Sequence, residues 1–442
     1  MFAKFATVFK IPELRRKIWL TLFLLFVYRM GFYIPLPPID QTQMAKNFQK
    51  MQQQGNTLGQ TLKLVELFSA SSFGNSTIFG LGIMPYISAS IIIQLLTTVS
   101  PHLEQLKKEG EQGRRQINQY TRYGTVILAA LQGYGIAIGL EGAGNVVLDP
   151  GWFFRITTAI TLVGGTVFLM WLGEQITARG VGNGISLIIF AGIVAQLPHA
   201  VVGTLELGRQ GALSTTLIVL LLIMCVVVVG VIVFMERAQR RLLVQYPKRQ
   251  VGNRMFQGDA SHLPLKLNSA GVIPPIFASS LLLLPITVAN FSAGRGPEWL
   301  NTVTAMLGRG QPLHIILYIA LIVFFAFFYT AVVFNPKDTA DNLKKYGGFL
   351  PGIRPGERTA EYIDYVLTRI TVVGAIYLAA VCVLPEILIS YAGVPFYFGG
   401  TSLLIVVSVT MDTVAQIQSH LLAHQYEGLI KRARLRGARR NR

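Results

Sequence analysis

Residues 82–93 read GIMPYISASIII, and residues 271–282 read GVIPPIFASSLL. Glycine, proline, isoleucine, alanine and serine recur in step, and most other positions exchange one aliphatic residue for another. A shorter match follows in the same order, because residues 184–189 read GISLII and residues 400–405 read GTSLLI. Apolar segments match by chance often, but two matches in the same order favour an internal duplication.

These matches lie in apolar segments that are long enough to cross a bilayer. Of the 442 residues, 52% are hydrophobic and 14% are charged, against about 25% charged in a typical soluble chain. Helices are expected, because lipid cannot hydrogen-bond a loose backbone and barrel strands would alternate polar with apolar residues. Ten spans are predicted: Ile18–Pro35, Ile78–Val99, Tyr123–Leu140, Trp152–Leu172, Ile185–Val202, Leu217–Phe234, Ala270–Ala289, Ile315–Phe334, Ile370–Tyr391 and Phe396–Thr410.

The matched segments are five spans apart in both cases. Because five is odd, the second half must insert upside down relative to the first, which predicts two inverted-topology halves of five spans. We place the halves at residues 1–205 and 206–423, followed by a basic tail at 424–442. Pro85 and Pro274 each remove a helical hydrogen bond, and the glycines before them permit a chain break. Broken spans at corresponding positions indicate a transport path.

The formal net charge of +18 is unevenly distributed. If both termini are cytoplasmic, 31 of the 39 Lys and Arg residues lie on the cytoplasmic side, which fits the positive-inside rule rather than nucleic-acid binding. Two cytoplasmic loops, 236–268 and 335–369, are longer and more basic than orientation requires. Binding of lipid headgroups is one interpretation. Docking of a large soluble partner is the one we favour.

The sequence contains no signature of an enzyme. It has neither a phosphate-binding Gly-Lys-Ser/Thr loop nor a His-Glu-x-x-His pair, and the lone cysteines Cys225 and Cys382 imply no metal site. Ser186 and Ser402 only faintly suggest an intramembrane hydrolase. Because the span interiors have few charges besides Arg29 and Asp412, proton or sodium coupling is disfavoured. A secondary transporter of a small solute stays open as an alternative.

The broken spans do present isoleucine. The repeat sets Ile87 against Ile276 and Ile189 against Ile405, while Ile83 and Ile185 lie four residues earlier and hence on the same helix faces. Any one of them could be an ordinary core or lipid-facing residue. Together they could form a dewetted constriction that blocks ions. The same apolar ring could open to let a large, chemically varied substrate pass.

A further segment, at about residues 60–76, is too polar to span the bilayer. It mixes apolar with polar residues, which fits a short amphipathic half-helix that dips into the outer funnel. Its members include Leu62, Leu64, Leu67, Phe68 and Ser72.

Several long motifs resemble the SecY family, the channel-forming subunits of the bacterial Sec protein translocon. They are residues 82–90, Gly113-Arg114-Arg115, 119–124, 182–186, Asn335-Pro336, 352–356 and 395–402, so the resemblance covers essentially the whole chain. It implies an all-α channel of ten transmembrane helices in the bacterial cytoplasmic (inner) membrane. It also implies the partner subunits SecE and SecG, the SecA motor ATPase, the ribosome, signal sequences and nascent polypeptides, with no cofactor and no sequence-specific nucleic-acid binding.

The resemblance also assigns roles to residues. The pore ring would be Ile83, Ile87, Ile185, Ile189, Ile276 and Ile405. The segment with Leu62, Leu64, Leu67, Phe68 and Ser72 would be the plug that closes the resting pore. The lateral gate, where signal sequences reach lipid, would include Pro85, Ser88, Ser90, Gln94, Pro274, Ser279 and Ser280. Partner docking would involve Arg240, Arg241, Lys248, Arg249, Arg354, Pro355 and Tyr426.

Overall fold

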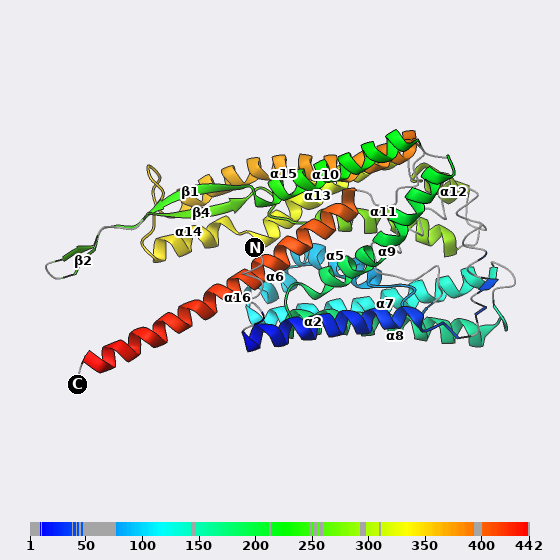
Figure 1. Ribbon diagram of the computed structural model, residues 1–442, viewed down its shortest axis with the longest axis horizontal. Helices are drawn as coiled ribbons and strands as arrows, with labels where there is room; N and C mark the ends of the chain where they lie inside the picture. The colour runs from blue at the N-terminus through cyan, green and yellow to red at the C-terminus, as the bar shows by residue number, and fades with distance from the viewer. Residues whose placement is uncertain are drawn as a thin grey trace. The chain divides into compact units, whose positions relative to one another are not determined.

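The computed structural model describes residues 9, 11–37, 39–40, 42–43, 46, 77–142, 147–211, 214–247, 249–251, 254–256, 260–291, 298–308, 311–392 and 400–440. The first part of the chain forms α2 (Pro12–Met30), the 3-10 helix η1 (Gly31–Tyr33), α5 (Met84–Val99), α6 (Pro101–Lys108), α7 (Glu111–Gly142), α8 (Trp152–Arg179), α9 (Gly184–Arg209) and α10 (Thr215–Arg237). The remainder forms β1 (Gln239–Gln245), β2 (Arg249–Val251), β3 (Arg254–Phe256), β4 (Ala260–Lys266), α11 (Ile273–Phe291), α12 (Glu298–Met306), α13 (Pro312–Val333), α14 (Pro336–Lys345), α15 (Glu357–Ala392) and α16 (Gly400–Arg440) (Figure 1).

A helix lies on each of the ten predicted spans. Seven helices within the described residues are long and apolar enough to cross a membrane, or eight if α5 and α6 form one span with a 97° bend. The helix α2 is not among these seven, because its first turns carry the charged residues Glu13, Arg15, Arg16 and Lys17. Its Arg29 lies in the last turn of the helix rather than deep in the span. The final helix runs further than expected, to Arg440.

Prolines mark where several of these helices begin. The first turn of α2, α5, α6, α13 and α14 contains a proline, where its missing N–H costs no helical hydrogen bond. Side chains cap the starts of α10 and α14: the Ser214 hydroxyl accepts from the N–H of Leu217, and Asn335 Oδ1 accepts from the N–H of Lys337.

The chain divides into two compact units. Unit 1 comprises Met1–His199, Leu283–Gly308 and Val409–Arg442, and unit 2 comprises Ala200–Leu282 and Arg309–Ser408. This division differs from the predicted halves, because Leu283–Gly308 and the later part of α16 group with the first half of the chain. The inverted repeat itself therefore stays a prediction.

In unit 1, α7 and α8 form the most extensive helix pair and lie side by side in Figure 1. Ion pairs join them at both ends. Arg122 donates two hydrogen bonds, of 2.9 and 2.8 Å, to the carboxylate of Glu174. At the other end, Glu141 accepts from Arg155 Nε at 2.8 Å and from the N–H of Gly151 at 2.9 Å. Charges at the ends of a helix pair fix its register while its middle stays apolar.

Unit 1 also buries the turn that precedes α5. Phe79 is 1% exposed, with its ring stacked between Tyr28 and Phe168 at centroid distances of 6.2 Å each. Two glycines make room for this turn: a Cβ on Gly31 would overlap the Phe79 ring, and one on Gly165 would overlap the carbonyl oxygen of Ile78. Close backbone approach of this kind is the common use of glycine in membrane helices.

In unit 2, α13 packs along α15, while β1 and β4 form an antiparallel ribbon beside α14 and α15 (Figure 1). Alternate side chains of the ribbon enter a small core formed by Leu242, Val244, Leu265, Leu350 and Ile363. The sequence predicts a basic loop at residues 236–268, whereas the structure has strands there. A second short pair, β2 and β3, lies between them in the chain.

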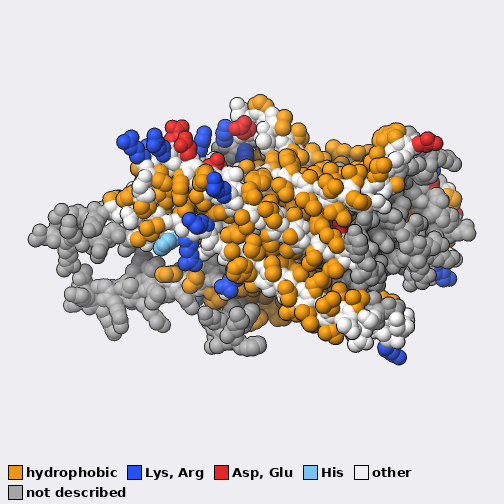
Figure 2. Space-filling view, turned by 90° about the horizontal axis from the view of Figure 1, so that it is seen from above, with side chains coloured by type: hydrophobic (Ala, Val, Ile, Leu, Met, Phe, Trp, Pro, Cys, Tyr) orange, Lys and Arg blue, Asp and Glu red, His pale blue; other side chains and the backbone are white. Residues whose placement is uncertain are grey.

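The exposed surface of unit 2 is largely apolar. The helix α10 has the highest mean hydropathy of the candidate spans, 3.6 over its most apolar 18 residues, and only 11% of those residues are buried. On the face shown in Figure 2, hydrophobic side chains cover the middle, most of the Lys, Arg, Asp and Glu side chains lie toward the left, and a few lie at the right. An apolar surface of this extent requires lipid as its solvent.

Replacing Gly165 with alanine should destabilise the protein by about 1–3 kcal/mol, because the new methyl group must displace the backbone of Ile78. Gly164→Ala is the matched control, since a Cβ on Gly164 meets nothing within 4 Å. Thermal unfolding of the detergent-purified variants measures both effects. Equal melting temperatures for the two variants would contradict the packing described for this turn.

Candidate pore, gate and docking sites

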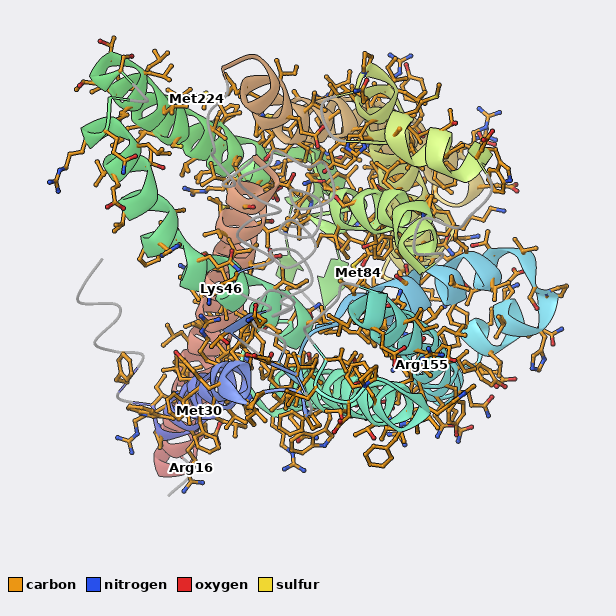
Figure 3. All side chains as sticks on the ribbon, turned by 90° about the vertical axis from the view of Figure 1, so that its right-hand side faces the viewer. Arg16, Met30, Lys46, Met84, Arg155 and Met224 are labelled. Atoms are coloured by element: carbon orange, nitrogen blue, oxygen red, sulfur yellow. The ribbon has the colours of Figure 1, made fainter. Side chains whose placement is uncertain are left out.

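The helix α5 begins later than the sequence predicted. Residues 78–83 form turns, Gly82 has a φ of 57°, and the helix starts at Met84 with Pro85 in its first turn; Met84 is labelled in Figure 3. The chain is therefore broken at the glycine, as expected. Pro85 removes no helical hydrogen bond, because it stands where the helix begins.

The helix α11 begins in the same way in unit 2. Gly271 has a φ of 65°, and the helix starts at Ile273 with Pro274 as its second residue. In both stretches a left-handed glycine therefore precedes the helix by two residues and the proline by three. A left-handed backbone favours glycine over other residues. The sequence match thus extends to the local backbone conformation.

The shorter match also coincides with helix starts. Gly184 is the first residue of α9, and Gly400 is the first residue of α16. The start of α9 is capped by Asn183, whose Oδ1 accepts from the N–H groups of Ile185 and Ser186. Its Gly184 lies so close to α8 that a Cβ would overlap the carbonyl oxygen of Gly173.

Three side chains of unit 1 that carry no recognisable sequence motif accept hydrogen bonds from the backbone between α8 and α9. The hydroxyl of Thr21 accepts from the N–H of Val181 at 3.0 Å, Thr177 accepts from Gly184 at 2.9 Å, and Gln416 accepts from Gly182 at 2.9 Å. They come from α2, α8 and α16. No sequence spacing links them, so only the fold could reveal this set.

The six predicted pore isoleucines lie on four helices or their caps. Ile83 and Ile87 are one turn apart, since the N–H of Ile87 donates to the carbonyl of Ile83 at 3.1 Å. Ile185 and Ile189 have the same spacing on α9. Their exposed fractions are 0% for Ile83, 5% for Ile87 and 2% for Ile189, whereas Ile185 is half-buried. In unit 2, Ile276 on α11 is 8% exposed and Ile405 on α16 is 1% exposed.

The predicted gate residues lie on the same two helices, α5 and α11, as several of these isoleucines. Ser88 is buried, and its hydroxyl and the Gln94 side-chain oxygen have no hydrogen-bond partner among the described residues. Ser90 is half-buried. On α11, Pro274 is buried, the Ser280 hydroxyl donates to the carbonyl of Ile276, and the Ser279 hydroxyl donates to the carbonyl of Pro275.

The two basic loops of the sequence form one structure in unit 2. Gln245 at the end of β1 and Phe349 of the other loop exchange two backbone hydrogen bonds, of 2.9 and 3.0 Å. Arg240 and Arg241 are exposed on β1. Arg354 and Pro355 are exposed at a tip between Gly352 and Gly356, both with positive φ.

The tip is held from beneath. Ile353 packs against the core that supports the ribbon, and the hydroxyl of Thr359 donates to the carbonyl of Arg354 at 2.8 Å. The Arg354 guanidinium is thus presented on a fixed backbone.

Other predicted residues have less support. Tyr426 on α16 is 64% exposed, and Arg249 begins β2. Lys248 and the plug residues Leu62, Leu64, Leu67, Phe68 and Ser72 lie outside the described residues.

Comparison with known proteins identifies the family of this chain. The SecY family model matches residues 77–414. The chain is 53% identical over 429 residues to the protein translocase subunit SecY of Escherichia coli strain K12, covering 96% of each protein. The chain belongs to the SecY family.

Solved structures agree with the family at the level of the fold. One matching structure is a SecY protein whose plug domain stabilises the closed state of the translocation channel. It matches with a TM-score of 0.65 at 19% identity, covering 91% of each chain. The channel of the canine ribosome–channel complex from the endoplasmic reticulum matches with a TM-score of 0.61 at 19% identity and the same coverage. The predictions of an all-α, multi-pass membrane protein of the SecY family and of a non-enzymatic role are confirmed.

Gly271→Val should lower stability by roughly 1–2 kcal/mol, since valine resists the left-handed backbone, and Gly271→Asn should cost less. A Cβ at Gly271 meets nothing within 4 Å, so the backbone alone is tested. Gly230→Val is the control, because Gly230 has equally open surroundings within the helix α10. Melting temperatures of the detergent-purified variants measure these differences in stability. Equal melting temperatures for Gly271→Asn and Gly271→Val would show that the left-handed backbone of Gly271 does not limit stability.

Proposed function

We propose that this chain is the channel that passes unfolded polypeptides across the cytoplasmic membrane and releases transmembrane segments sideways into lipid. The observation that carries the proposal is the matched pair of broken spans, each with a left-handed glycine, a helix start and a proline at the same offsets, in a member of the family of translocase subunits. The comparisons give no support to a secondary transporter.

The pore ring of the proposal is formed by Ile83, Ile87, Ile185, Ile189, Ile276 and Ile405. The burial of all of them except the half-buried Ile185, and the one-turn spacing on α5 and α9, support it. Branched apolar side chains would exclude ions by dewetting and would bind no passing segment tightly. The plug at about residues 60–76 would close the channel from outside. In the SecY structure that this chain matches, the plug domain stabilises the closed state of the channel.

The lateral gate of the proposal lies along α5 and α11, with Pro85, Ser88, Ser90, Gln94, Pro274, Ser279 and Ser280. Leaving a buried polar atom unbonded costs about 1–3 kcal/mol, so the atoms of Ser88 and Gln94 that lack partners among the described residues suit a helix that exchanges neighbours. An entering polypeptide backbone would supply donors and acceptors to them.

The proposed placement has both termini in the cytoplasm, with inverted halves at 1–205 and 206–423 and the tail at 424–442. The exposed basic groups of the ribbon and of the tip would then face the cytoplasm. We assign Arg240, Arg241, Lys248, Arg249, Arg354, Pro355 and Tyr426 to docking of the SecA motor and of the ribosome. SecE and SecG would complete the channel, and membrane lipids would surround it.

Replacing Ile87, Ile189, Ile276 or Ile405 with glycine should raise the resting ion conductance of the reconstituted channel, since a smaller side chain admits water to the constriction. Conductance of vesicles that contain the purified translocon measures this. Ile188→Gly is the control, because Ile188 is 0% exposed, neighbours Ile189 and points to another face of α9. The pore assignment fails if all four variants conduct like the parent protein.

Arg354→Glu should weaken motor-driven export, because the reversed charge sits on an exposed, fixed tip. Insertion and orientation of the channel itself should be unchanged. Uptake of a secretory precursor into vesicles measures export. Arg209→Glu makes the same change of charge at an exposed position that the proposal places on the opposite side of the membrane. Normal export by the Arg354 variant would count against the docking role.

A further inference from the structure

Tyr318 joins three helices in the interior of unit 2. It lies on α13, is 4% exposed, and has its hydroxyl 3.4 Å from Ser279 Oγ on α11 and 3.4 Å from Thr401 Oγ1 on α16. Thr401 is itself 6% exposed. One hydroxyl oxygen therefore lies at the meeting point of two helices that are 122 residues apart at these positions.

Both partners of Tyr318 are close to proposed pore residues. Ser279 follows Ile276 by three residues, and Thr401 precedes Ile405 by four, so each lies about one helical turn away on the same face. Phe277, which follows Ile276, packs edge-on against Phe325 of α13 at a centroid distance of 5.7 Å. The contacts of α13 thus reach both helices of unit 2 that carry pore isoleucines.

The ring of Tyr318 is supported on its other side. The imidazole of His314 stacks on it at a centroid distance of 6.0 Å and an interplanar angle of 21°. His314 Nε2 lies 3.4 Å from Glu386 Oε1 on α15. A carboxylate, an imidazole and a phenol therefore form a buried row that fixes the direction in which the Tyr318 hydroxyl points.

We propose that Tyr318 is a positioning residue of the channel: its hydroxyl holds Ile276 and Ile405 at fixed places relative to each other within unit 2. This inference rests on the proposed pore function of the two isoleucines. A loss of the hydroxyl would leave the aromatic packing in place but free α11 and α16 to shift against each other. A shift of either helix would open the constriction in the resting channel.

The decisive variant is Tyr318→Phe, which removes one oxygen and keeps the ring. We expect a several-fold rise in resting ion conductance of vesicles with the full translocon, at an unchanged melting temperature of the purified complex. Tyr377→Phe is the matched control: Tyr377 on α15 is 7% exposed, and its hydroxyl has no hydrogen-bond partner among the described residues. It should conduct like the parent channel.

A double-mutant cycle separates positioning from general loosening. Thr401→Val is nearly isosteric and breaks one of the two contacts that Tyr318→Phe removes. The variant with both substitutions should therefore conduct no more than Tyr318→Phe alone. Multiplied effects would overturn the inference. A parental conductance per folded channel in Tyr318→Phe would also overturn it, whatever the yield of folded protein.

Ile405→Gly, measured in parallel, separates this inference from the function on which it rests. If Ile405→Gly raises conductance and Tyr318→Phe does not, the positioning role is wrong and the pore assignment stands. If none of the isoleucine variants raises conductance, the pore assignment itself is wrong.

Discussion

An apolar span that is interrupted must find partners for its backbone N–H and C=O groups inside the protein, because lipid offers none. The described turns of both units meet this requirement in different ways. Before α5, the N–H of Ile78 donates to the carbonyl of Ile34 at 3.2 Å, and the N–H of Gly82 donates to that of Phe79 at 2.9 Å. Before α11, the Asn268 side chain donates to the carbonyl of Gly271 and to Glu236 Oε1. A transmembrane helix can therefore be interrupted only where neighbouring segments supply hydrogen-bond partners to the backbone groups of the break.

Because each broken span needs hydrogen-bond partners, its turn must lie close to the backbone of a neighbouring helix. A buried turn can reach its partners only if the facing helix has no side chain in the way, and glycine is present at those positions. Gly165 faces Ile78, Gly173 faces Gly184, and Gly374 of α15 faces the carbonyl of Leu267. Glycine thus acts on both sides of each break: within the turn it permits the backbone conformation, and opposite the turn it permits the contact.

Much of the fold was predictable, because each span is a long local signal. A helix lies on each span that hydropathy predicted, and the Gly–x–x–Pro pattern correctly located two breaks. Hydropathy could not locate where α5 begins, since the turn residues Ile78, Phe79 and Leu81 are as apolar as a helix. Proline was read as a distortion within a helix, although the first turn of a helix tolerates it equally well.

The β1–β4 ribbon was missed for a related reason. Its basic residues gave the loop the character of a solvated segment, yet Leu242 and Val244 alternate with exposed residues and pair opposite Leu263 and Ser261. A period of two over so short a run is a weak signal. The candidate site was predictable only where it repeats: the isoleucines stand at matched offsets, whereas Thr21, Thr177, Gln416 and Tyr318 have no counterpart that the repeat could reveal.

The kinds of bond also differ between the parts of unit 1. Charge-assisted hydrogen bonds, the strong ones, join α7 to α8 at both ends through Arg122–Glu174 and Glu141–Arg155. The proposed gate helix α5 meets α7 through small residues, with Ala89 Cβ 3.5 Å from the position of a Cβ on Gly124. Its described side chains make no ion pair, and Ser88 and Gln94 each retain a buried polar atom without a partner among the described residues. Dispersion contacts between smooth surfaces re-form after a small displacement, whereas a bidentate ion pair is lost once its two partners leave their fixed geometry. A frame held by ion pairs around a helix held by packing is the arrangement that lets one span move without unfolding its neighbours.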